Sequence, residues 1–152
     1  MTAIGKARLF DPGQGTEHRI GPDRFVTKGA ASDRSEAFSV IEYEARPGVP
    51  GPPPHVHRMW EETWYILEGK VAFVADGVTA EAGPGAYLLV PRGVPHTFEV
   101  RGRRPARWIG IFSPGRFVGL VEELGAILPS SGPPDVKAIT RAFAKYDTEF
   151  AR

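Results

Sequence analysis

Apolar residues in the middle of the chain gather in short runs separated by turn sequences. Six runs are rich in β-branched and aromatic residues, which is typical of β-strands: residues 38–45, 62–69, 70–76, 86–91, 96–100 and 106–113. Glycine and proline mark the turns between them, from the run at 47–54 to the Asp-Gly pair at 76–77. Short strands at this even spacing predict an all-β sandwich or barrel rather than alternating strands and helices.

The period of the apolar positions changes after Pro114. One stripe at helical spacing predicts a helix that Gly125 ends: Phe117, Leu120, Val121 and Leu124. A second stripe predicts a helix with Asp135 as its N-cap: Val136, Ile139, Phe143 and Tyr146. We expect both stripes to be packing surfaces rather than cofactor-binding faces.

The chain has 152 residues, a length that fits one compact domain with a buried core. We expect this single domain, residues 1–152, to have three parts. The weakly patterned residues 1–35 form an N-terminal arm, residues 36–113 the β-barrel, and residues 114–152 a C-terminal helical segment.

Composition narrows the classes of function. The formal net charge is only +1, without the basic excess that binding to nucleic acid requires. The chain has no cysteine, which excludes disulfides and thiolate chemistry and fits a cytoplasmic protein. It also has no apolar run of about 18 residues, so we expect no membrane partner.

Two of the four histidines, His55 and His57, stand one residue apart after the proline-rich turn. Alternate residues of an extended strand point to the same face, so these imidazoles can lie side by side as metal ligands do. Glu62 shares a face of the next predicted strand with the apolar residues Trp64 and Ile66. A carboxylate that faces a core needs a partner, and a divalent cation supplies one.

Two more residues bear on this site. Glu61 competes with Glu62 for the carboxylate role, but the face shared with Trp64 favours Glu62. His96 begins a later predicted strand and can face the same cavity. Three imidazoles and one carboxylate predict a mixed nitrogen and oxygen site, which suits Fe, Mn, Ni, Cu or Zn.

The spacing H-x-H-x4-E-x6-G, followed by G-x5-P-x-G-x2-H, resembles the two sequence motifs of the cupin superfamily. Eight residues carry the two motifs: His55, His57, Glu62, Gly69, Gly85, Pro91, Gly93 and His96. Two positions depart from the family pattern, with Val49 in place of a glycine and Val100 in place of an asparagine. The resemblance implies a double-stranded β-helix, or jelly-roll, barrel that is often dimeric. It also implies that four residues bind one metal ion: His55, His57, Glu62 and His96.

Within the superfamily the chain looks most like small cupins related to quercetin dioxygenase. We therefore expect a metal-dependent dioxygenase for a small aromatic or enolic substrate, with Fe(II) favoured and Glu62 as a candidate general base. Five aromatic residues are expected to line the substrate pocket, unless they only fill the barrel: Trp64, Phe98, Phe73, Tyr87 and Trp108. Two alternatives stay open, a non-redox metal-dependent cyclase or isomerase and a small-molecule binding module without catalysis. We expect a homodimer.

Overall fold

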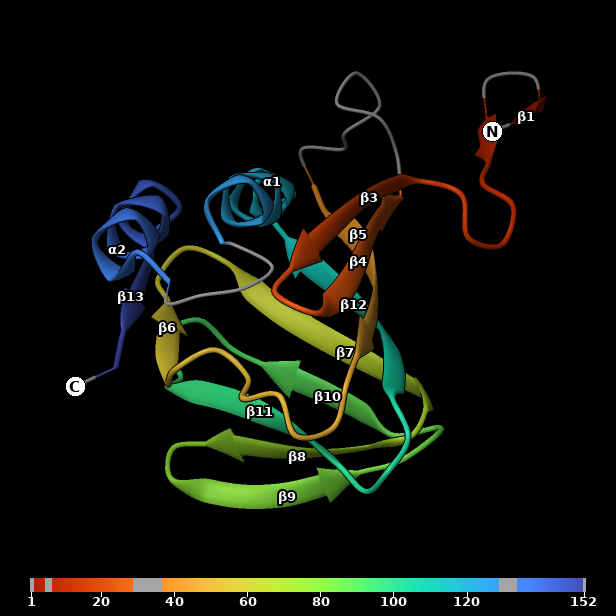
Figure 1. Ribbon diagram of the computed structural model, residues 1–152. Coiled ribbons are helices and arrows are strands. Elements are labelled where there is room, and N and C mark those ends of the chain that lie inside the picture. Colours follow the sequence, from red (N-terminus) through yellow and green to blue (C-terminus); the bar gives the residue numbers. More distant parts are fainter. Residues whose placement is uncertain (1, 5–6, 29–36, 129–133, 152) are drawn as a thin grey trace.

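The computed structural model describes residues 2–4, 7–28, 37–128 and 134–151. Two antiparallel sheets face each other, and two helices lie along one side of them (Figure 1). The first sheet has the order β10 (Tyr87–Val90), β7 (Glu61–Glu68), β12 (Ala106–Ser113), β5 (Ser39–Ala45), β4 (Asp23–Lys28), β3 (Thr16–Ile20). The second has the order β13 (Thr148–Phe150), β6 (His55–His57), β11 (His96–Arg101), β8 (Lys70–Ala75), β9 (Val78–Ala82). A separate hairpin joins β1 (Thr2–Ile4) to β2 (Ala7–Leu9).

This architecture confirms the all-β class and places a strand in each of the six predicted segments. The first part of the chain also contributes strands, because residues 16–28 form the hairpin β3–β4 at one edge of the six-stranded sheet. The predicted boundary between arm and barrel, at residues 35–36, lies outside the described residues.

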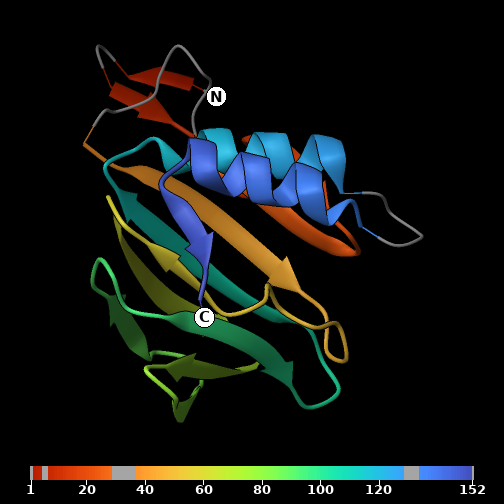
Figure 2. The ribbon, with the colours of Figure 1, turned by 90° about the vertical axis from the view of Figure 1, so that its left-hand side faces the viewer.

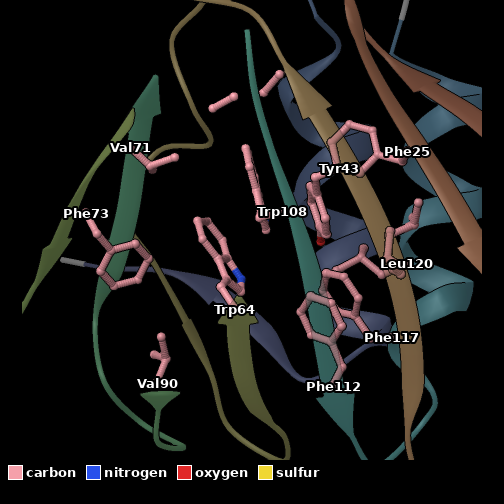
Figure 3. Packing of buried hydrophobic residues seen from close by; sticks show 14 of the residues in the cluster. Phe25, Tyr43, Trp64, Val71, Phe73, Val90, Trp108, Phe112, Phe117 and Leu120 are labelled. Carbon is pink, nitrogen blue, oxygen red and sulfur yellow. The ribbon is translucent and has the colours of Figure 1, made fainter. Parts of the chain in front are cut away.

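Alternation of buried and less buried side chains explains why the central strands pack face to face. Along β5 every second residue is buried, including Ile41 and Tyr43, and along β12 the same holds for Trp108 and Phe112. The rings of Tyr43, Trp108 and Trp64 form a continuous stack, with centroid distances of 4.9 and 4.8 Å between neighbours (Figure 3). Aromatic stacking of this kind fills the space between the sheets and fixes their spacing.

The two predicted helices are present as α1 (Phe117–Ile127) and α2 (Val136–Lys145), which lie side by side (Figure 2). Asp135 caps α2 as predicted, because its carboxylate accepts a 3.0 Å hydrogen bond from the backbone N–H of Ala138. The prediction that Gly125 ends α1 is wrong, since the helix continues to Ile127. Gly125 faces β3, where an added Cβ would already touch the carbonyl oxygen of Arg19 at 3.5 Å. Contacts between α1 and β3 offset the poor helix propensity of glycine, about 1 kcal/mol. Neither helix is long and apolar enough to span a bilayer, as far as the described residues go.

Candidate metal centre

Three short stretches of strand bring the predicted ligands together. His55 and His57 are the first and last residues of β6, and His96 opens the neighbouring strand β11 directly opposite His55. All three side chains are buried, and one ring nitrogen from each lies within 4.8 Å of the others. This three-histidine group could hold a metal ion.

The facing sheet supplies a buried carboxylate to the same point. Glu62 lies near the start of β7, and its Oε2 is 3.2 Å from Nε2 of His57 and 3.2 Å from Nε2 of His96. Its other oxygen, Oε1, accepts a hydrogen bond from the indole N–H of Trp64. Glu61, the competing candidate, is exposed and lies 3.8 Å from the guanidinium of Arg92. The structure thus brings Glu62, and not Glu61, to the three histidines.

Hydrogen bonds on the far side of each ring decide which nitrogen faces the centre. The Nδ1 atoms of His55 and His96 lie 3.0 and 2.9 Å from the carbonyl oxygens of Pro53 and Val94. A carbonyl oxygen only accepts, so Nδ1 carries the proton and Nε2 is the nitrogen available to the centre. The Nδ1 atom of His57 is likewise held on its far side, by the hydroxyl of Thr148 on β13, so that Nε2 faces the centre. Such supporting contacts orient imidazoles for metal binding.

Contacts within the cluster change the pKa values of some of its members. Burial, together with the nearby His96 and His57, lowers the pKa of His55 to about 3. Burial opposes ionisation of Glu62, but its contacts with His57 and His96 outweigh burial and hold the pKa of the carboxyl well below its usual range. Burial also opposes a charged His96, yet the contact with Glu62 outweighs it and raises the pKa of that imidazole. The cluster therefore holds a buried carboxylate that attracts positive charge.

One atom in the cluster has no hydrogen-bond partner. Nε2 of His57 is buried, and its 3.2 Å approach to Glu62 does not have hydrogen-bond geometry. A buried polar atom without a partner calls for an explanation, and a bound ion is one such explanation. Together with the converging Nε2 atoms and the carboxylate, it fits a divalent metal ion.

A cavity of about 400 Å³ opens beside these residues. The four candidate ligands lie in its wall, and most of the remaining wall is apolar. Apart from Val136, which is exposed, the helix stripes pack in the core as predicted. They also contribute to this wall, through Leu120, Val121 and Leu124 of α1 and Ile139 and Phe143 of α2. Sequence reasoning missed this second role, because a stripe that faces a cavity has the same apolar spacing as one that faces a core.

Comparison with known proteins identifies the fold family. Residues 41–112 match the family model of the cupin domain. The protein thus contains a cupin domain. It is 31% identical over 71 residues to quercetin 2,3-dioxygenase of Bacillus subtilis (strain 168). That match covers 47% of this chain and 21% of the dioxygenase, so the matched part amounts to about a fifth of that protein's length.

Solved structures support the same fold. The chain resembles KdgF from a Halomonas species with a TM-score of 0.63 and 18% identity, over 72% of this chain and 96% of that one. It also resembles an RmlC-like cupin from Shewanella frigidimarina NCIMB 400, with a TM-score of 0.60 and 24% identity over 72% and 94% of the two chains. At these identities the likeness concerns the fold alone.

The cupin barrel places the five predicted pocket residues in three different environments. Trp64 and Phe98 line the cavity. Phe73 lies behind the site, with its ring stacked 5.8 Å from that of His96, and Trp108 is fully buried against Trp64. Neither of these two is among the residues that line the cavity.

Tyr87 does not line the cavity either, and its side chain is 65% exposed. The reason is the alternation of side chains along β10, because Val90 points into the core and Tyr87 therefore points outward. Tyr87 is paired with Tyr65 of β7, which is also exposed. The cavity instead takes Phe25 from β4 and Tyr43 from β5. The strand of Phe25 was not predicted from its sequence, which is why that residue was missed.

Proposed function

We propose that this cupin is a metal-dependent dioxygenase that acts on a small aromatic or enolic compound. The observation that carries the proposal is the position of three histidines and one carboxylate in the wall of an apolar cavity. Active sites of this kind combine a few converging polar groups with an apolar wall. The local identity to quercetin 2,3-dioxygenase supports the choice of reaction.

In this proposal the metal ligands are the three histidines and one oxygen of Glu62. The mixed nitrogen and oxygen set suits iron(II), which we favour, and also Mn, Ni, Cu or Zn. When bound, such a cation supplies Lewis-acid activation of a substrate hydroxyl and a place for O₂ beside it.

The protein's own residues would bind the substrate and handle its proton. Trp64, Phe98 and Tyr43 in the cavity wall offer flat apolar surfaces to an aromatic ring and keep water away from it. Glu62 is ionised at neutral pH, and if its Oε2 were released from its role as a ligand, that oxygen would accept the proton of the substrate hydroxyl. The indole N–H of Trp64 holds the other carboxylate oxygen and thereby fixes the direction of Oε2.

We also propose that the protein is a homodimer and that it works in the cytoplasm. Support for the dimer comes from the outer apolar face, a set of exposed residues on the outer side of three neighbouring strands: Tyr65, Leu67, Tyr87, Leu89 and Ile111. A contiguous apolar patch on a protein surface commonly marks an interaction site. The cytoplasmic location is the expectation from the cysteine-free composition.

Elemental analysis of the purified protein tests the metal centre. We expect about one transition-metal ion per chain in the wild type after anaerobic loading with Fe(II), and a loss of that ion in His57→Ala, because removal of one ligand weakens the site strongly. His18→Ala is the matched control, since His18 is the one histidine outside the cluster. Retention of metal by His57→Ala, or its loss from His18→Ala, would contradict the assignment.

Oxygen uptake tests the reaction. The Fe(II)-loaded protein should consume O₂ when a flavonol or another enolic compound is added, and it should not turn these substrates over without O₂. If no such compound triggers uptake, the dioxygenase proposal is wrong. Turnover by the Zn-loaded protein under anaerobic conditions would instead identify a non-redox cyclase or isomerase.

A further inference from the structure

The threonine that holds His57 lies far away in the sequence. Thr148 is the first residue of β13, the last described strand, and pairs in register with His57 on β6. Its side chain is buried, and its Oγ1 lies 2.9 Å from Nδ1 of His57. The same hydroxyl donates a 3.1 Å hydrogen bond to the carbonyl oxygen of Tyr146.

These two contacts determine where the proton on His57 lies. A threonine hydroxyl has a single hydrogen, and in this structure that hydrogen is donated in a hydrogen bond to the carbonyl oxygen of Tyr146. The oxygen of Thr148 is then left as an acceptor toward His57, so Nδ1 of the imidazole must be the donor. In the neutral ring this leaves the lone pair on Nε2, which faces Glu62 and the other two histidines.

His57 differs in this respect from the other two histidines. His55 and His96 are each held by a backbone carbonyl two residues earlier in the chain, so the local backbone fixes them. His57 is held by a side chain from another strand. Its orientation therefore depends on one replaceable hydroxyl and on the docking of β13.

Backbone contacts hold β13 in place beside β6. The N–H of Arg58 donates to the carbonyl oxygen of Asp147 at 2.8 Å, and the N–H of Ala151 donates to that of Pro54 at 2.8 Å. These bonds flank Thr148 on both sides, so its hydroxyl has little freedom to move away from the imidazole.

We infer that Thr148 is a positioning residue of the metal centre, which sets the tautomer and orientation of His57 from outside the ligand set. The inference rests on the proposed metal site. Partners of this kind change metal affinity by about 10- to 100-fold when they are removed. Thr148→Val keeps the shape of the side chain but cannot accept the Nδ1–H, whereas Thr148→Ser keeps the hydroxyl.

Zn²⁺ titration of the metal-free protein against a competing chromophoric chelator tests the inference. We expect Thr148→Val to bind Zn²⁺ about 10- to 100-fold more weakly than the wild type, and Thr148→Ser to stay within a few-fold of it. Thr140→Val is the matched control, because the hydroxyl of Thr140 is exposed and bonds within α2 to the carbonyl of Val136. Equal affinity of Thr148→Val and wild type would overturn the inference and leave the metal site intact. Failure of the wild type to bind Zn²⁺ or any of the other candidate metals would instead reject the proposed function.

Nitrogen-15 NMR of histidine-labelled protein gives a second readout, and its measurement on the wild type does not depend on the folding of any variant. In the wild type, the ring nitrogens of neutral His57 should show Nδ1 protonated and Nε2 unprotonated. Thr148→Val should show a shift toward a mixture of the two tautomers, and Thr148→Ser should restore the wild-type pattern. A wild-type His57 with its proton on Nε2 would overturn the inference.

Discussion

Among single residues, Glu42 joins three strands on the outer side of the six-stranded sheet. Its carboxylate on β5 lies 2.9 Å from Nζ of Lys28 on β4 and 2.7 Å from the guanidinium of Arg107 on β12. The hydrogen bonds from Lys28 and then from Arg107 hold the pKa of Glu42 below its usual value. A carboxyl with a lowered pKa in the folded state stabilises the fold above its unfolded pKa, and this stability is lost as the pH falls through the folded pKa.

Glu42→Gln should therefore lower the free energy of unfolding by about 0.5–1 kcal/mol at pH 7, because a network of two ion pairs at a partly buried site is lost. Below the lowered pKa of Glu42 the difference should disappear, since the wild-type carboxyl is then protonated too. Urea denaturation of both metal-free proteins at pH 7 and at an acidic pH where the wild-type carboxyl is protonated measures the two differences. The same loss at both pH values would show that packing, and not charge, explains it.

The sequence could predict the site residues whose side-chain direction follows from the alternation of side chains along a strand. The separation of two between His55 and His57, and between Glu62 and Trp64, places each pair on one face, as the structure has them. Because β10 is apolar along its whole length, its sequence does not show which alternate residues face the core. Tyr87 was expected to line the pocket, but it faces solvent. Thr148 gave no signal at all, because its role depends on a strand pairing 91 residues away.

At the scale of elements, two hairpins differ in how much room they leave at their turn glycine. Gly69 joins β7 to β8 with φ +77°, and an added Cβ would lie 2.6 Å from Cα of Ala106 and 2.7 Å from the carbonyl oxygen of Pro105. Gly77 joins β8 to β9 with a similar φ of +75°, but nothing lies within 4 Å of its added Cβ. The pair thus separates the effect of backbone conformation from that of steric overlap.

Gly77→Ala should lower the free energy of unfolding by about 1–2 kcal/mol, the cost of a left-handed conformation for a residue with a Cβ. Gly69→Ala should lower it by a further 1–3 kcal/mol, because backbone atoms of the neighbouring strand must also move. Guanidinium denaturation of the wild type and both variants measures the difference. An equal loss for the two variants would mean that the β7–β8 turn adjusts without cost.

Elements were predictable where their side chains alternate between core and surface. The strands β5 and β12 do so over their full length, and both were predicted. The hairpin β3–β4 and the strand β9 were not, since β9 is mostly exposed and β3 has no buried residue. Such strands form because a neighbouring strand offers backbone hydrogen bonds, and this is information that a local pattern does not contain.

For the whole molecule, the outer apolar face predicts self-association. Light scattering after size exclusion should give about twice the chain mass of 16.6 kDa. Tyr87→Lys should shift the protein toward the single-chain mass, because a buried unpaired charge in an apolar interface is unfavourable. Val78→Lys is the control, since Val78 is equally exposed but lies on β9 of the other sheet. A wild type that runs at the mass of one chain would contradict the dimer.

The separation between His57 and Thr148 also sets an order of events during synthesis. A ribosome that adds about 5–20 residues per second delivers Thr148 roughly 5–20 s after His57, since Thr148 stands 91 positions further along the chain. The three clustered histidines and Glu62 are made before β13, so a nascent chain contains all four proposed ligands while the ring of His57 still lacks its hydrogen-bond partner. In the proposed metal site, a cation captured at that stage would be bound before Thr148 supports His57, and the docking of β13 would then supply that support.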